Sequence, residues 1–144
     1  LISGLEITNP DAGYGIVVNG VSNATISNNN LHDIGSILVG ASNNSATAQA
    51  IYLVGAADSA QISNNTITTI GSADSKSSNK GIFIGDSLAN TITGVSVTNN
   101  QITNVVGGRG AYGILVNHEA TSLTVSGNTI NTLSGMWVHA IGLH

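Results

Sequence analysis

The chain of 144 residues has no cysteine, a single proline and few charged or aromatic residues. Without cysteine it can form neither a disulfide nor a zinc site with thiolate ligands. No apolar run reaches the roughly 18 residues that a membrane-spanning helix needs, so membrane insertion is not expected. The chain has three Lys and Arg residues and seven Asp and Glu residues. This balance excludes a basic surface for nucleic acid or for an anionic membrane.

Metal-binding patterns are also missing from the sequence. The acidic residues are scattered, without the Asp-rich nonapeptide repeat that binds calcium, and calcium therefore has no support. His32-Asp33 and His118-Glu119 have no further ligand at a fixed spacing. We expect neither a metal site nor a cofactor. Asn, Ser, Thr and Gly supply the polarity instead, and such a neutral, hydrogen-bonding surface favours an extracellular or cell-surface location.

One phrase recurs along the chain: a Gly-Ile-x-Val segment followed by an Ile-Ser-Asn-Asn-x-Ile segment. It is complete from Gly15, Ala50, Gly81 and Gly113, with small variations, and it opens again at Ala140. Repetition with a period of about 20–50 residues indicates a solenoid. Helical repeats are a poor alternative, because no window shows a 3.6-residue spacing and Gly, Thr, Ser and Asn are weak helix formers.

Alignment of the repeats places aliphatic residues in columns, two for each predicted strand. The first strand has Ile16, Ile51, Ile82, Ile114 and Ile141, then Val18, Leu53, Ile84, Val116 and Leu143; the second has Ala24, Ala60, Val95 and Leu123, then Ile2, Ile26, Ile62, Val97 and Val125; the third has Ile7, Leu31, Ile67, Ile102 and Ile130, then Ile34, Ile70, Val105 and Leu133. Apolar residues at every second position are typical of a strand with one buried face. Such short strands must pair with equivalent strands of neighbouring repeats. The pattern therefore predicts an all-β fold, a right-handed parallel β-helix of about five coils with three strands each.

An Asn column lies between the second and third strands, at Asn29, Asn65, Asn100 and Asn128. Asn tolerates left-handed backbone angles, and its amide both donates and accepts hydrogen bonds. We expect these side chains to form a structural ladder along the solenoid axis. Residues 1–144 should form one domain. Since Leu1 begins inside a repeat and no end cap is evident, we interpret this domain as a fragment of a longer solenoid.

Two candidate sites follow from the alignment. Lys80, Arg109, Tyr112 and His139 lie near one edge, where they could converge as a cation for a sugar carboxylate and a group that moves a proton. The second site is an outward column of Val17, Tyr52, Phe83 and Leu115, with Lys76 on the same edge. The small residues beside this column, such as Gly81, should leave the apolar side chains standing on a flat face. Two interpretations remain open for that face: it binds sugar rings or a partner, including a second copy, or other segments cover it.

The Gly-Ile-x-Val opening and the Ile-Ser-Asn-Asn-x-Ile turn resemble the pectate-lyase-like superfamily of right-handed β-helices. That superfamily contains polysaccharide lyases, glycoside hydrolases, epimerases, phage tailspikes and bacterial surface proteins, so the resemblance implies the fold and leaves the function open. The acidic residues that polygalacturonase-like hydrolases carry before this strand are replaced by Tyr14, Gln49, Lys80, Tyr112 and His139. The stretch 111–119 is similar to a Tyr-Gly-Phe-Asp-Pro-His-Glu motif of mannuronan epimerases, but it lacks the Asp and the Pro.

Two functions from different classes are therefore expected. The favoured one is an exported or cell-surface module, a rigid scaffold that binds polysaccharide, cell-surface glycan or a protein partner. The alternative is a fragment of a lyase or epimerase that acts on uronate-containing polysaccharide, with the remaining catalytic residues in other coils.

Overall fold

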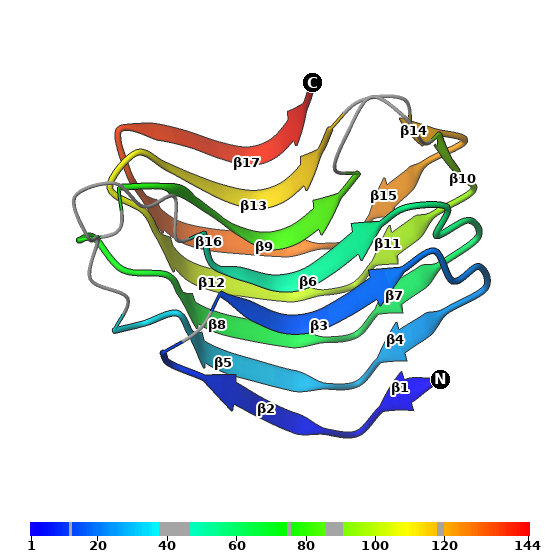
Figure 1. Ribbon diagram of the computed structural model, residues 1–144, viewed down its shortest axis with the longest axis horizontal. Helices are drawn as coiled ribbons and strands as arrows, with labels where there is room; N and C mark the ends of the chain where they lie inside the picture. Colours follow the sequence, from blue (N-terminus) through cyan, green and yellow to red (C-terminus); the bar gives the residue numbers. More distant parts are fainter. Residues whose placement is uncertain (12, 38–46, 75, 86–90, 118–119) are drawn as a thin grey trace.

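The computed structural model describes residues 1–11, 13–37, 47–74, 76–85, 91–117 and 120–144. Within these residues the strands form three parallel sheets of five strands each, and one further pair of strands (Figure 1). Sheet A contains β1 (Ile2–Ser3), β4 (Thr25–Ser27), β7 (Gln61–Ser63), β11 (Ser96–Thr98) and β15 (Thr124–Ser126). Sheet B contains β2 (Glu6–Asn9), β5 (Asn30–Ile34), β8 (Thr66–Ile70), β12 (Gln101–Val106) and β16 (Thr129–Ser134). Sheet C contains β3 (Tyr14–Asn19), β6 (Gln49–Val54), β9 (Ser78–Ile84), β13 (Gly110–Val116) and β17 (Trp137–Leu143).

Each coil contributes one strand to sheet A, then one to sheet B, then one to sheet C. Figure 1 shows the coils stacked along one axis, with β1 and β2 at one end and β17 at the other. The predicted three-strand repeat and its stacking are confirmed. The pair of β10 (Ile92–Thr93) and β14 (Ala120–Thr121) was not expected; it lies between sheets C and A in two adjacent coils.

The predicted aliphatic columns form the core. Strand pairing places Ile16 beside Ile51, Ile51 beside Ile82, and Ile82 beside Ile114, and the other columns follow in the same register. The central members are completely buried, as are those of sheets A and B. Removal of this much apolar surface from water is the main force that holds the coils together, since each buried Ile contributes on the order of 2 kcal/mol.

The Asn ladder is confirmed at the turn between sheets A and B. The Asn29 Nδ2 group donates to Oδ1 of Asn65 at 3.0 Å, Asn65 Nδ2 to Asn100 Oδ1 at 2.9 Å, and Asn100 Nδ2 to Asn128 Oδ1 at 2.9 Å. The left-handed backbone, however, belongs to the residue before each ladder position: Asn28, Asn64, Asn99 and Gly127 have φ between 55° and 65°. The two Asn residues of the repeated Ile-Ser-Asn-Asn segment thus have different roles. The first makes the turn, and the second satisfies buried backbone groups.

The small residues of sheet C face the core, and the expectation that they flatten the outer surface is wrong. A Cβ on Gly81 would lie 2.7 Å from the Gly113 carbonyl oxygen and 2.7 Å from Cγ2 of Ile102, which belongs to sheet B. Gly81 and Ile82 are both buried, so two successive residues point inward where the strand bends. The bend brings sheet C close to sheet B, and that approach leaves no room for a larger side chain.

No helix within the described ranges is long and apolar enough to cross a membrane.

Candidate functional site

All five Phe, Trp and Tyr residues of the chain lie on the strands of sheet C, on its outer face. They are Tyr14, Tyr52, Phe83, Tyr112 and Trp137. These strands position them because the neighbouring apolar residues of each strand face the core, and the remaining side chains must face outward. We call this surface the outer face of sheet C. Aromatic side chains are concentrated on this face, whereas small and polar side chains predominate in the rest of the sequence.

The rings stack on one another along the solenoid axis. The Tyr14 and Tyr52 centroids are 5.9 Å apart with an interplanar angle of 15°, and those of Tyr52 and Phe83 are 5.1 Å apart at 9°. Tyr112 stacks on His139 in the same way, at 5.2 Å and 13°. The Tyr52–Phe83 and Tyr112–His139 stacks follow from strand pairing, which places equivalent residues about 4.8 Å apart. Tyr14 instead pairs with Gln49, and its ring reaches Tyr52 from the neighbouring column. Because the faces of these rings contact each other, the stack presents ring edges and hydroxyl groups outward.

A second outward column contains the residues that replace the hydrolase carboxylates. Strand pairing aligns Tyr14, Gln49, Lys80, Tyr112 and His139 in that order, as the sequence alignment predicted. The Lys80 Nζ atom lies 5.1 Å from the centroid of the Phe83 ring, a cation–π contact. Its surroundings exclude much of the solvent, and this desolvation lowers the pKa of Lys80 from its ordinary value to about 8.

Lys80 lines a hollow of about 290 Å³ on this face, together with Ser78, Phe83, Tyr112, Leu115, Asn117 and His144. The His144 ring lies edge-on to Tyr112, with 6.3 Å between the centroids. The five strands of sheet C contain no Asp or Glu. One buried acceptor nearby, Oε1 of Gln49, has no hydrogen-bond partner among the described residues. Lys80 and Gln49 are neighbours in register.

The predicted binding column is in register but not uniformly exposed. Val17, Tyr52, Phe83 and Leu115 pair as expected, and Val17 is 47% exposed. Phe83 and Leu115 are only 9% and 7% exposed, and form a buried cluster with Tyr112. The structure therefore does not show the expected flat face with fully exposed apolar side chains. The adjacent outward column packs against them, because Tyr112 leans over the position that Gly142 leaves empty.

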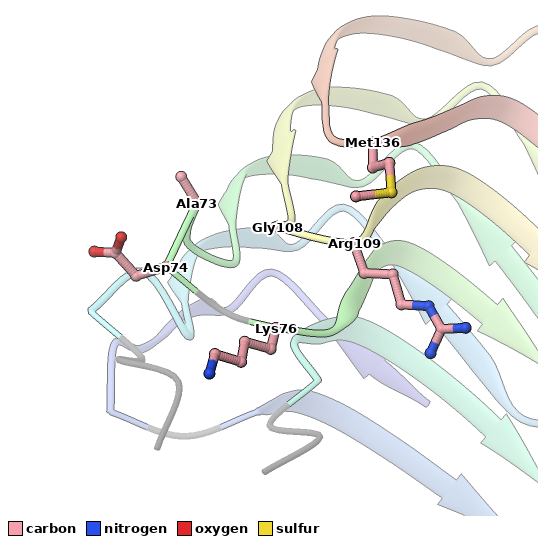
Figure 2. Close-up of a pocket in the computed structure, with 6 residues that line it drawn as sticks. All are labelled: Ala73, Asp74, Lys76, Gly108, Arg109 and Met136. Carbon is pink, nitrogen blue, oxygen red and sulfur yellow. The ribbon is translucent and has the colours of Figure 1, made fainter. Parts of the chain in front are cut away.

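The two other basic candidates lie at the turns between sheets B and C. Lys76 and Arg109 line a separate hollow of about 520 Å³ with Ala73, Asp74, Gly108 and Met136. Figure 2 shows the two side chains pointing away from one another. The Arg109 guanidinium lies 5.3 Å from the Trp137 ring centroid. Lys80, Tyr112 and His139 are thus brought together, whereas Arg109 lines the other hollow with Lys76 and contacts Trp137.

The sequence analysis missed Trp137 and His144 as parts of this face. Trp137 precedes His139 by two positions and therefore shares its outward orientation, a signal that the alternation of the strand already carried. His144 could not have been found in this way, since its contact depends on how its ring folds toward Tyr112. His118 and Glu119, the end of the epimerase-like stretch, lie outside the described residues.

The other charged cluster lies on sheet B. His32 Nδ1 is 2.7 Å from Asp33 Oδ2, and His32 Nε2 is 3.1 Å from Glu6 Oε1, a partner that sequence spacing did not reveal. The hydrogen bonds to Asp33 and Glu6 raise the pKa of His32 above its ordinary value. The carboxylates contact opposite ring nitrogens, so they do not converge on one point. No group of three potential metal ligands is found in the described parts of the chain.

Comparisons with known proteins give the family and nothing finer. A search of curated proteins found no match, and a search of solved structures found none either. The family described as "Right handed beta helix region" matches residues 1–140. Three parallel sheets joined coil by coil and an Asn ladder agree with that assignment. The chain therefore belongs to the right-handed β-helix family.

Proposed function

We propose that the chain is a rigid scaffold of an exported or cell-surface protein and that the outer face of sheet C binds polysaccharide. One observation carries this proposal: all five aromatic residues and the one lysine of the sheet lie on the same face, on strands that the solenoid core holds rigid. Tyrosine hydroxyl groups and ring edges suit a ligand with many hydroxyl groups and apolar C–H surfaces.

Two exposed rings test the proposal. Tyr14 is 47% exposed and Trp137 is 51% exposed, so replacement of either by Ala should leave the core unchanged. An aromatic contact contributes about 0.5–1.5 kcal/mol, and the double variant Tyr14→Ala, Trp137→Ala should therefore lose about tenfold or more in affinity. Val21→Ala, which removes an equally exposed apolar side chain outside sheet C, is the matched control.

The measurement is calorimetric titration with uronate and neutral oligosaccharides. Equal affinity of the double variant and the wild type would contradict binding on this face. If the wild type binds no oligosaccharide and sediments as a dimer that the double variant disrupts, the face is a self-association surface instead.

A second candidate function is uronate lyase or epimerase activity. The observation that favours it is the adjacency of Lys80, Tyr112 and His139, with a Lys80 pKa of about 8 that suits proton abstraction near neutral pH. In this mechanism Lys80 or Tyr112 removes the proton next to the sugar carboxylate. The test follows the ultraviolet absorbance of unsaturated product with uronate polymers. Turnover that Lys80→Met and Tyr112→Phe abolish would support catalysis, whereas the absence of turnover would leave the scaffold function alone.

A further inference from the structure

The hollow beside Lys80 has features that change the chemistry of a primary amine. Phe83, Tyr112 and Leu115 line it and form one buried apolar cluster. The Lys80 side chain is half-buried, and its Nζ atom lies 5.1 Å from the centroid of the Phe83 ring. That cation–π contact stabilises the ammonium form, but removal of the amine from solvent acts in the opposite direction and is the larger effect. A lysine held against apolar walls favours its neutral form, and the neutral amine is a nucleophile.

No negative charge on the sheet restores the ammonium form. The ion pairs among the described residues are both made by His32, on sheet B. Among the described residues, the titratable groups that face the same side as Lys80 are Tyr14 on β3, Tyr52 on β6, Tyr112 on β13, and His139 and His144 beside or on β17. None of these described groups is a carboxylate that could hold the amine in its charged form. The lowered pKa of Lys80 agrees with this arrangement.

We propose that Lys80 is a reactive amine that captures small aldehydes as imines within this hollow. The lone pair of the neutral Nζ attacks the carbonyl carbon, a C–N bond forms as the C=O π bond breaks, and the nitrogen loses one proton while the oxygen gains one, to give a neutral carbinolamine. The hydroxyl group then leaves as water while the nitrogen loses its remaining proton, so that one aldehyde and one amine yield one imine and one water. The step requires no oxidant or reductant. Tyr112, whose ring lines the hollow, is the nearest phenol of the same column and can supply a proton to the departing hydroxyl group.

The size of the hollow suits a small ligand. A volume of about 290 Å³ admits a small aldehyde, including the open-chain form of a single reducing sugar. This inference does not rest on polysaccharide binding, since the amine reacts with any aldehyde that fits.

The chain contains its own control, because Lys76 lies exposed on the turn before β9 and lines the other hollow. The probe is glyoxylate with cyanoborohydride, which reduces each imine to a stable secondary amine. Tandem mass spectrometry of the chymotryptic peptide that contains both lysines then assigns the label to Lys76 or Lys80, and gives the initial rate of labelling at each between pH 6 and 10.5. At pH 8 about half of the Lys80 amine is neutral, against about 0.4% for an ordinary lysine with a pKa of about 10.4. We expect Lys80 to be labelled at least tenfold faster than Lys76 at pH 8, with a half-maximal rate near that pH.

Two results would overturn the proposal: labelling of Lys80 within about threefold of Lys76 at pH 8, or rates at both lysines that rise together toward pH 10. Lys80→Arg keeps the positive charge and removes the nucleophile, so it should abolish the fast phase and leave labelling of Lys76 unchanged. The circular dichroism of this variant shows whether it is folded. Oligosaccharide titration of the same variant keeps the outcome separate from the binding function of the face.

Discussion

The Asn ladder should contribute stability in proportion to the burial of each rung, and Asn65→Ala is the sharpest test. Asn65 is 1% exposed and has four hydrogen bonds through its side chain. Its Oδ1 atom accepts from the backbone N–H and from the Nδ2 group of Asn29, both at 3.0 Å. Its Nδ2 group donates to the Ile26 carbonyl at 3.0 Å and to Asn100 Oδ1 at 2.9 Å.

The expected loss follows from these partners. The buried Asn29 N–H loses its acceptor, which costs about 1–3 kcal/mol, and each of the two bonds donated by Nδ2 adds about 0.5–1.5 kcal/mol. Asn65→Ala should therefore lower the free energy of unfolding by about 2–6 kcal/mol. Urea denaturation followed by far-ultraviolet circular dichroism measures this quantity.

Asn128→Ala is the matched control. Asn128 accepts from the Asn100 backbone N–H at 2.9 Å and donates to the Val97 carbonyl at 2.9 Å, but its side chain is partly exposed. Water can replace the bond to Val97, whereas the N–H of Asn100, a residue that is 0% exposed, loses its acceptor. We therefore expect a loss of about 1–3 kcal/mol, smaller than that of Asn65→Ala. The reasoning is refuted if the two variants lose equal stability, or if Asn65→Ala loses less than about 1 kcal/mol.

Two further predictions concern pH and packing. The hydrogen bonds to Asp33 and Glu6 raise the folded pKa of His32 above 6.5, so their contribution to stability is fully present below the unfolded pKa of His32 and is lost as pH rises through its folded pKa. His32→Gln should therefore narrow the difference between the free energies of unfolding at pH 5.5 and pH 8. An unchanged difference would contradict this linkage. For packing, Gly81→Ala should cost about 1–3 kcal/mol because its Cβ meets backbone and core atoms at 2.7 Å. In contrast, a Cβ at Gly4 would have no atom within 4 Å, so Gly4→Ala should cost only the strain of its left-handed φ of 70°, about 1 kcal/mol. Equal shifts in the melting temperatures of the two variants would argue against the inward bend at Gly81.

The aliphatic columns and the ladder positions could be predicted because each coil repeats the same physical requirement. A column such as Ile51 and Ile82 must face inward in every coil, and the sequence shows this directly. The turn was harder, since Asn28 and Asn29 are the same residue type and only the backbone angles separate their roles. Local strand geometry caused the error at Gly81, where two successive inward residues break the assumed alternation.

The candidate site depended more on side-chain conformation than on register. Register alone aligned Lys80 with Tyr112, and the structure agrees. The burial of Phe83 and Leu115 depends on where Tyr112 places its ring, a choice among rotamers that the pattern of apolar residues does not encode. Tertiary packing of one outward column on the next therefore decided what a ligand can reach.

The strands of sheet C repeat once per coil, and this gives its outer face an approximate translational symmetry. A polymer that lies along the solenoid axis would meet one Phe, Trp or Tyr ring in each coil, at steps of about 4.8 Å, although the rings do not all occupy the same column. Such a ligand could slide between several registers of similar free energy. Lys80 is the one Lys, Arg, Asp or Glu on the strands of sheet C, and it breaks that symmetry. A negatively charged group on the polymer would thus lower the free energy of the one register in which it lies beside Lys80.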